Sequence, residues 1–316
     1  MSAVIAVAVS GGRDSTALLH ATCRAARGTG LQVLALHVHH GLMREADDWV
    51  AHLQAQCRRW HRGGLPVQLM WRRLSAAPAR AESVEAWARR ERYRALGEMA
   101  REAGATIVLL AHHRQDQAET FLLQALRLGS PRGLAAMPQH VRREGLSWWR
   151  PWLNHDAEAI AAYVRRWRLR HVQDNSNADP RFARSRLRAQ VWPALREAFP
   201  QVDERFAAAA ARAQETAECL QELADVDAAA CVDAEGGLGR TAWLRLSPAR
   251  RLNLLRHWLA RVLGQGPPET LVRRLMAEWP LARGGARWPA PAGSLLHRAD
   301  RLRMCGPSAP VPRPSP

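Results

Sequence analysis

The sequence predicts an α/β protein in which a doubly wound parallel sheet is followed by a second, smaller helical domain. In the first half of the 316-residue chain, short apolar runs alternate with segments of helical length, as a parallel sheet with crossover helices requires. A Gly-Gly turn directly follows the first apolar run. Beyond about residue 150 the pattern becomes helical throughout.

Four apolar runs have the composition of buried strands, at residues 4–9, 32–38, 67–71 and 106–111. The first contains only valine, isoleucine and alanine, which is typical of a strand covered on both faces. Between the runs, helical spacing of apolar side chains predicts helices over residues 14–26, 45–60 and 82–103. Ligands of such sheets bind beyond the carboxyl ends of the strands, so the turns there are the expected place of a site.

The second half is predicted to be helical over residues 156–167, 180–197, 203–230, 247–262 and 269–279. Pro193 and Pro200 bracket a short charged segment, which indicates a domain boundary. We therefore expect one domain over residues 1–197, a mostly helical domain over 198–305 and a disordered Pro/Ser-rich tail over 306–316.

The charge balance favours a polyanionic partner, most simply nucleic acid. Basic residues outnumber acidic ones by 46 to 29, the formal net charge is +17, and the pI is about 11.4. Every basic residue is arginine, because the sequence contains no lysine. A genomic bias toward arginine would explain the missing lysine but not the net excess. Without lysine, a Walker-type phosphate loop and a lysine Schiff base are both excluded.

Cysteine usage and hydropathy indicate a cytoplasmic protein with no membrane partner. The five cysteines are scattered and form no Cys-x-x-Cys pair, which disfavours a zinc or iron–sulfur site built from cysteine. No apolar run approaches the about 18 residues that a membrane span needs. The apolar first segment lacks the basic residues of a secretory signal and is interpreted as a strand.

The turn Ser10-Gly11-Gly12-Arg13-Asp14-Ser15 has the chemistry of a phosphate site. Two glycines allow a sharp turn that exposes successive backbone N–H groups to an anion. The helix that follows directs its positive N-terminal end at the same place. The hydroxyls of Ser10 and Ser15 can contact phosphate oxygens, and Asp14 can cap the helix or reach Mg²⁺. An ordinary glycine turn with an Asp/Ser N-cap is the alternative.

This turn resembles the PP-loop of the ATP-pyrophosphatases, which have the adenine nucleotide alpha hydrolase-like fold and cleave ATP to AMP and pyrophosphate. Further segments resemble the tRNA(Ile)-lysidine synthetase family, strongly over roughly the first 200 residues and more weakly from about 240 to 305. The clearest is AHHRQDQAET at residues 111–120. The others are residues 37–42, 46–49, 85–96, 133–137, 150–151, 174–177 and 184–188.

The resemblance implies an enzyme that adenylates the C2 oxygen of the wobble cytidine in an isoleucine tRNA with a CAU anticodon. ATP and Mg²⁺ are the implied cofactors, and free L-lysine then displaces AMP to give lysidine. Asp14 and Asp116 would hold Mg²⁺ against the phosphates, since both follow predicted strands. His112 and His113 would orient a phosphate or relay a proton, with structural hydrogen bonds at a strand end as the alternative.

The histidines of the second predicted strand do not indicate a metal cluster. Alternation along the strand splits His37, His39 and His40 between the two faces of the sheet, which disfavours zinc. We expect His37 to pack around the nucleotide, whose phosphates the turn at residues 10–15 would bind.

Five arginines are candidates for contacts with tRNA or the triphosphate, because guanidinium groups match phosphate geometry. They are Arg89, Arg92, Arg184, Arg186 and Arg188. A solvated basic face is the alternative for each of them. Trp148, Trp149 and Trp152 are candidates for base stacking, with core packing as the alternative.

Four departures from the family pattern bear on activity. Gln115 stands where an aspartate is usual, Ser185 where an asparagine is usual and Ala157 where an arginine is common, and the glycine-rich stretch is shortened to residues 129–133. Two other functions therefore stay open, a PP-loop tRNA cytidine thiolase and a catalytically impaired basic RNA-binding protein. The scattered cysteines disfavour the first of these, and the intact phosphate turn disfavours the second. A monomer and a homodimer are both compatible with the sequence.

Overall fold

The computed structural model describes residues 3–39, 41, 46–74, 84–127, 131–172, 182–291 and 293–306. His40, residues 174–177, part of the loop 129–133 and the tail beyond residue 306 lie outside the described residues. The chain divides into two compact units, Met1–Gln214 and Glu215–Pro316. The division falls inside one long helix, later in the chain than the boundary predicted after residue 197.

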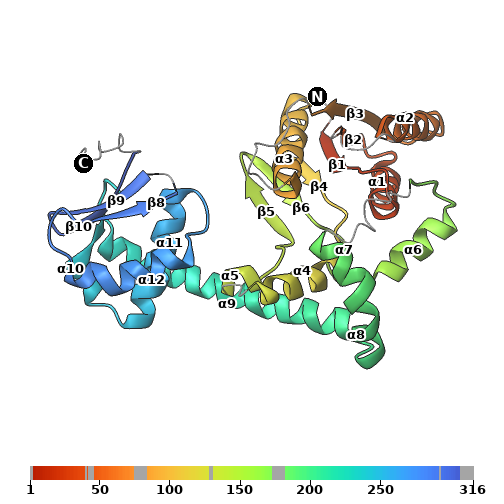
Figure 1. Cartoon of the computed structure of the whole chain (residues 1–316). Coiled ribbons are helices and arrows are strands. Elements are labelled where there is room, and N and C mark those ends of the chain that lie inside the picture. The colour runs from red at the N-terminus through yellow and green to blue at the C-terminus, as the bar shows by residue number, and fades with distance from the viewer. Residues whose placement is uncertain are drawn as a thin grey trace, which may run out of the picture. The chain divides into compact units, whose positions relative to one another are not determined.

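The first unit is built on a six-stranded sheet with the order β3-β2-β1-β4-β6-β5 (Figure 1). Its strands are β1 (Val4–Ala8), β2 (Gln32–His39), β3 (Val67–Arg73), β4 (Ile107–Leu109), β5 (His140–Arg143) and β6 (Leu146–Trp149). All neighbours pair in parallel except β5, which pairs antiparallel with β6 at one edge. The predicted doubly wound parallel sheet is therefore confirmed.

Helices cover both faces of this sheet because successive strand side chains point to opposite faces. On one face, Val7, Val33 and Ala35 pack with residues of α1 (Arg13–Ala26), α2 (Ala46–Arg62) and α6 (Ala157–Arg166). On the other, Leu34 and Val108 pack with α3 (Val84–Glu102). Since β1 and β2 are apolar on both faces, they form the centre of the core.

The hairpin of β5 and β6 was not predicted. Trp148 is buried in the core beneath α3, where its ring lies 5.2 Å from that of Tyr93, so it is not available for base stacking. Trp149 is partly exposed and stacks on His140 with a centroid distance of 4.4 Å. Trp152 packs against the core beside α1 and α6. Core packing is thus the better interpretation of Trp148 and Trp152.

The segment predicted as one helix over residues 180–197 is interrupted. It forms α7 (Ala183–Arg186), a π-helical turn η2 (Leu187–Val191) and α8 (Trp192–Ala198). These pack on α4 (Arg114–Leu126) through Ala118, Leu187 and Trp192. Such π turns are frequent at functional sites, and this one contains Arg188.

The long helix α9 (Val202–Cys231) leads into the second unit, which contains more than the predicted helices. Its helical elements are α10 (Arg240–Leu244), α11 (Pro248–Leu263), α12 (Glu269–Glu278) and the 3-10 turn η3 (Trp279–Leu281). An antiparallel sheet of order β7-β10-β9-β8 completes it, from β7 (Leu238–Gly239), β8 (Arg287–Ala290), β9 (Gly293–Arg298) and β10 (Arg301–Cys305). The mostly helical prediction missed this sheet.

One further short helix, α5 (Pro131–Leu134), follows α4. Among the described helices, none combines the length and apolar composition that crossing a bilayer demands.

Candidate active site

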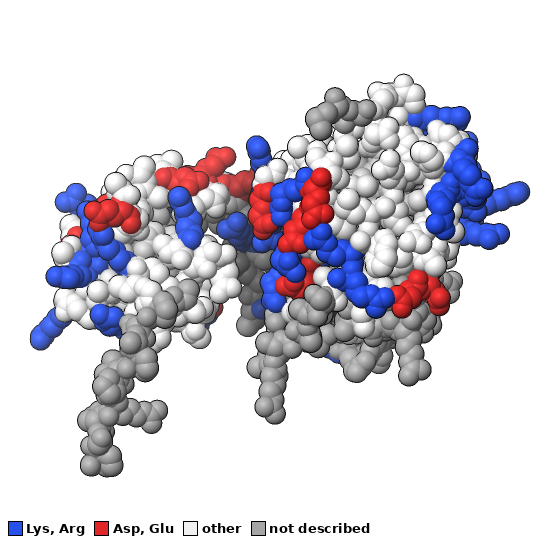
Figure 2. All heavy atoms as spheres, turned by 90° about the horizontal axis from the view of Figure 1, so that it is seen from above, with Lys and Arg blue, Asp and Glu red and all other residues white. Residues whose placement is uncertain are grey.

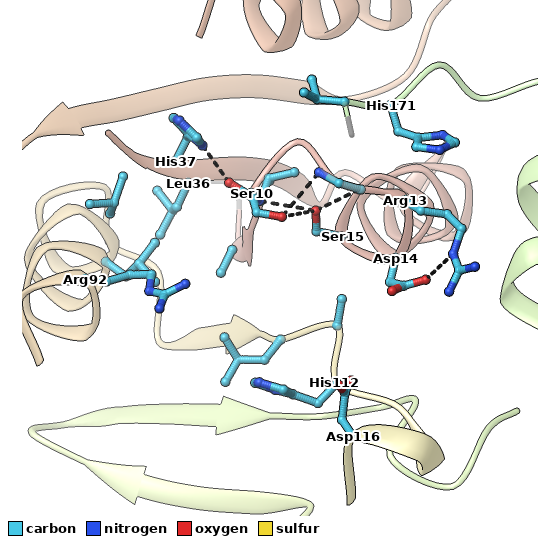
Figure 3. Close-up of a pocket in the computed structure, with 18 of the residues that line it drawn as sticks. Ser10, Arg13, Asp14, Ser15, Leu36, His37, Arg92, His112, Asp116 and His171 are labelled. Carbon is cyan, nitrogen blue, oxygen red and sulfur yellow. Dashed lines mark hydrogen bonds and ion pairs between the residues drawn. The ribbon is translucent and has the colours of Figure 1, made fainter. Parts of the chain in front are cut away.

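The carboxyl ends of β1, β2 and β4 open onto a hollow of about 700 Å³ (Figure 3). It lies where the strand order reverses, between β1 and β4, which is the usual ligand position in doubly wound sheets. Its volume is within the range of small-ligand sites. The predicted residues that line it are Ser10, Gly12, Arg13, Asp14, Ser15, His37, Arg89, Arg92, His112, His113, Asp116 and Arg188. Two segments far apart in the sequence, those after β1 and β4, are thereby brought together.

Hydrogen bonds among its own residues stabilise the turn that follows β1. The backbone N–H of Gly12 donates to Ser10 Oγ over 3.2 Å, and Ser10 N–H donates to Ser15 Oγ over 3.2 Å. The two serine hydroxyls lie 3.1 Å apart, and Ser15 Oγ also donates to the Gly12 carbonyl over 3.1 Å. Because the serines bond each other, their hydroxyls face the same side of the loop, where a phosphate would meet both.

A distant segment fixes the outer side of this turn. Gly11 adopts a φ of +93°, which is unfavourable for any residue with a side chain. Its carbonyl accepts hydrogen bonds from the Val172 backbone N–H (2.9 Å) and the Thr16 hydroxyl (3.3 Å). α1 begins at Arg13, and its first residues, Arg13, Asp14 and Ser15, line the hollow, so the positive N-terminal end of the helix lies at the site.

His113 lies between the two predicted metal-binding carboxylates. Its Nε2 is 3.7 Å from Asp14 Oδ2 and 3.5 Å from Asp116 Oδ2. Burial lowers the pKa of His113, but the interaction with Asp14 and the charges of both aspartates outweigh burial and raise the pKa above its ordinary value. Burial raises the pKa of Asp14, but His113 and Arg13 outweigh it, so that pKa is lowered. The raised pKa of His113 and the lowered pKa of Asp14 both reflect the close approach of the ring to the carboxylates.

His112 has the opposite character. Burial lowers its pKa to about 3, and the charges of Arg150, Arg89 and Arg184 act in the same direction against that of Asp116. The ring is therefore neutral at physiological pH. Its buried Nδ1 has no hydrogen-bond partner among the described residues. The pKa values of the two neighbouring histidines are thus shifted in opposite directions, and of the two only His113 lies within 4 Å of carboxylates.

A second acidic residue stands behind Asp116 on α4. Glu119 is fully buried, and Arg188 bridges the two carboxylates, with Nε 2.7 Å from Glu119 and Nη2 2.8 Å from Asp116. Gln115 Nε2 donates to the same Glu119 oxygen over 2.9 Å, and its carbonyl accepts from Arg196 over 3.0 Å. The departure at residue 115 therefore replaces a carboxylate by an amide that links Glu119 to an arginine of α8.

Glu119 was not recognised from the sequence, although it follows Asp116 by three residues and so lies on the same helical face. Its partners could not be read from spacing, because Arg188 is 69 residues away in sequence. Arg184 donates to the Thr120 hydroxyl over 2.6 Å and lies 3.7 Å from Glu119, outside the hollow. Arg186 is not among the lining residues either.

The wall formed by α3 is positively charged. The guanidinium of Arg89 lies 5.2 Å above the ring of Tyr93. Burial lowers the pKa of Arg92, and the neighbouring charge of Arg89 lowers it further. Among the described residues, no carboxylate is paired with either arginine, so both charges are available to an anion in the hollow. Figure 3 shows Arg92 directed from α3 toward the phosphate turn.

The histidines of β2 form no metal site in the described part of the chain. His37 Nδ1 donates to the Val9 carbonyl over 2.8 Å, which leaves Nε2 as the acceptor nitrogen of a ring that lines the hollow. His39 Nε2 instead lies 3.3 Å from Asp47 at the start of α2. No three His, Cys, Asp or Glu side chains of the described residues are grouped as a metal site would be.

Two known protein families match successive parts of this chain. Residues 2–195 match the PP-loop domain family, and residues 238–303 match the TilS substrate binding domain. A tRNA(Ile)-lysidine synthase of Bordetella pertussis is 40% identical over 280 residues, which cover 87% of this chain and 85% of that protein. One of Chromobacterium violaceum is 39% identical over 306 residues, covering 94% of this chain and 67% of that protein.

Among solved structures, the U34-tRNA thiolase NcsA from Methanococcus maripaludis, with its [4Fe-4S] cluster, superposes with a TM-score of 0.56. It is 12% identical, and the match covers 68% of this chain and 73% of that one. This likeness concerns the fold alone. Together, the two family matches and the relatives at about 40% identity show that the chain belongs to the tRNA(Ile)-lysidine synthase family of PP-loop proteins.

Proposed function

We propose that this protein is an ATP-dependent ligase that joins lysine to the wobble cytidine of an isoleucine tRNA with a CAU anticodon. The C2 oxygen of the cytidine attacks the α-phosphorus of ATP and pyrophosphate leaves. Lysine then displaces AMP, forming the C–N bond of lysidine. The observation that carries the proposal is the convergence of the phosphate turn, Asp14, His113 and Asp116 on one hollow in a chain that also has a TilS substrate binding domain.

The phosphate turn and the α3 wall would both contact the phosphates of ATP, from opposite sides. The turn at residues 10–15 and the first-turn amides of α1 receive the pyrophosphate portion. Arg89 and Arg92 face it from α3 and offset its charge. His37 and the apolar residues beside it, Leu36 and Trp49, provide a place for the base at the β2 side of the hollow.

Asp14 and Asp116 are the residues that we propose hold Mg²⁺. Their Oδ2 atoms approach the same nitrogen of His113, so both carboxylates converge on one point beside the phosphate turn. Mg²⁺ is commonly bound by one or two carboxylates together with substrate phosphates and water, so a larger cluster of protein ligands is not required. When bound, it would neutralise charge on the phosphates. His113 Nε2 lies at this point, 3.7 Å from Asp14 and 3.5 Å from Asp116.

Arg188 and Glu119 affect the proposed metal site indirectly, through Asp116. Arg188 keeps Asp116 oriented, and Glu119 fixes the guanidinium of Arg188 from its other side. Both are positioning residues in this arrangement, whereas Asp14, Asp116, His112 and His113 face the reacting groups. Arg184, Arg186 and Arg188 are also proposed to contact tRNA, for Arg188 at the cost of its carboxylate partners.

The wider assignments follow from the same function. Residues 1–197 would supply the ATP-binding catalytic domain and residues 198–305 the domain that binds tRNA. A cytoplasmic location and a monomer or homodimer are compatible with it. The thiolase alternative is disfavoured because the cysteines of the described residues form no cluster. The inactive-binder alternative loses weight because Gln115 is integrated by hydrogen bonds on both sides.

The test is incorporation of radiolabelled lysine into purified isoleucine tRNA with a CAU anticodon, in the presence of ATP and Mg²⁺. Labelling should require ATP and should be lost when the wobble base is changed. Asp14→Asn should abolish it while leaving tRNA binding intact, and Asp48→Asn, which removes the same charge from α2 away from the hollow, should not. ATP and tRNA binding without lysine transfer would favour the thiolase or the inactive binder instead.

A further inference from the structure

Two sets of arginines in the first unit differ in their partners. Arg72 of β3 and Arg94 of α3 are paired with carboxylates. Arg72 donates to Glu98 over 2.6 Å and to Glu102 over 2.7 Å. Arg94 lies 2.8 Å from Glu91 and 2.7 Å from Glu98. Charges balanced in this way attract no polyanion, so α3 presents an ion-pair network toward solvent.

The second group lies at the C-terminal end of α2 and has no such partners. Arg58, His61 and Arg62 are exposed, and they share one face of the helix because they are separated by three or four residues. No carboxylate among the described residues pairs with any of them. Figure 2 shows blue side chains gathered at the right-hand edge, the side on which α2 and α6 lie in Figure 1, whereas red and blue interleave over α3.

These three side chains form one wall of a groove, which we call the α2–β3 groove. Its space is about 760 Å³, and it is lined by Gln54, Cys57, Arg58, His61 and Arg62 of α2 and by Val67, Gln68, Leu69 and Trp71 of β3. Trp71 is 39% exposed, although tryptophan is usually covered in a folded protein. Here β3 is the edge strand of the sheet, so its outer side has no neighbouring strand.

We propose that the α2–β3 groove is a second tRNA-binding surface, which holds a phosphate backbone on Arg58 and Arg62 and stacks an unpaired base on Trp71. The pairing of cations with an exposed aromatic ring is the arrangement that binds single-stranded nucleic acid. An acidic peptide would use the cations but gain little from the indole. That the RNA is the substrate tRNA rests on the proposed function.

The groove is separate from the hollow but lies close enough in the sheet for one RNA to contact both. The two share no lining residue. The β2–β3 register pairs His37 of the hollow with Trp71 of the groove, so the sites are on adjacent strands. A tRNA whose anticodon enters the hollow can therefore place a neighbouring segment along the edge strand.

The test is the affinity of the full-length protein for unmodified isoleucine tRNA as a function of salt. The double variant Arg58→Gln/Arg62→Gln removes two positive charges from the groove. It should reduce the slope of log K against log salt concentration by about 1.4–1.8, because each lost phosphate contact accounts for roughly 0.7–0.9. Trp71→Ala should weaken binding about fivefold or more with little change in slope, and Trp71→Phe should retain most of the affinity.

The matched control is the double variant Arg94→Gln/Arg101→Gln. Arg101 also lies on α3, and its guanidinium is 3.6 Å from Glu144. This variant removes the same charge from an ion-paired surface and should leave the slope unchanged. Lysine transfer at saturating tRNA should keep its kcat in the groove variants and show a raised KM. Equal slopes for the groove and control pairs would overturn the proposal. If no protein form transfers lysine but the slopes still differ, the groove stands and the proposed function fails.

Discussion

Arg188 is the residue whose replacement tests the organisation of the active site most directly. Its guanidinium is the main positive charge against Glu119, which is fully buried, and it also holds Asp116. In Arg188→Met the long apolar stem is kept and the charge is removed. Glu119 would then retain the amide of Gln115 and the more distant guanidinium of Arg184, at 3.7 Å.

The expected loss of stability follows from this geometry. Removing one partner of a buried ion pair costs about 3–5 kcal/mol, because the remaining charge is left without compensation. The side chain of Arg188 is 37% exposed and Arg184 stays nearby, so we expect the lower end, about 3 kcal/mol. For a unit of this size, each kcal/mol shifts Tm by about 2–4 °C, which predicts a decrease of about 6–12 °C.

The second variant separates charge burial from packing. Arg188→Met combined with Glu119→Met removes both charges and should recover most of the lost stability, because the buried carboxylate is gone. Both variants should transfer lysine more slowly than the unaltered protein, since Asp116 loses its hydrogen bond from Arg188 and keeps the one from the His113 backbone N–H. Thermal unfolding followed by tryptophan fluorescence and by calorimetry measures both effects. If the double variant were as unstable as the single one, the burial argument for Glu119 would be refuted.

Three further predictions concern other parts of the chain. The raised pKa of His113 means that its contribution to stability is complete below the unfolded pKa of about 6.5 and is lost as pH rises through the folded pKa. Urea unfolding should therefore show the largest deficit of His113→Gln near pH 6 and a smaller one near pH 9; a deficit independent of pH would contradict the charged state. Gly11→Ala should cost about 1–2 kcal/mol and abolish ATP binding, whereas Gly28→Ala, at a similar φ of +77° in open space, should cost as much but bind ATP normally by calorimetric titration. His297 is buried, neither of its ring nitrogens is hydrogen-bonded to a described residue, and it packs edge-on against Trp279. Because His297→Phe removes these unpaired polar atoms, it should slow amide exchange at Leu295 and Leu302 of the same sheet. Faster exchange would mean that the larger ring overpacks the core.

The parts of the fold that could be predicted are those whose composition reports burial on both faces. The strands at residues 4–9 and 32–38 are almost wholly apolar because helices cover both sides of the sheet. The hairpin strand β5 has four exposed positions, and two of them are arginine, so it lacks any apolar alternation. The sheet of the second unit was missed for a related reason. β10 alternates arginine with apolar residues over only five positions, and β8 has four residues, one of which is proline.

The candidate site likewise contains residues that could be predicted from the sequence and residues that could not. Residues 10–15 and 112–116 could be placed because each follows a predicted strand, and parallel strands bring their carboxyl ends to one edge. The pairing of Glu119 with Arg188 depends on how α7 and η2 pack on α4. That packing depends on contacts among Ala118, Leu187 and Trp192. The sequence shows that these residues are apolar but not which of them contact one another.

The backbone bond between Val172 and Gly11 has a consequence for the order of events during synthesis. The phosphate turn is among the first segments to leave the ribosome, yet its outer side is fixed by a residue that follows about 160 positions later. Arg188, which orients Asp116, emerges later still. A nascent chain can therefore pair β1 with β2 early, but it acquires a finished phosphate site only after η2 has joined α4, and ATP can stabilise the fold only from then on.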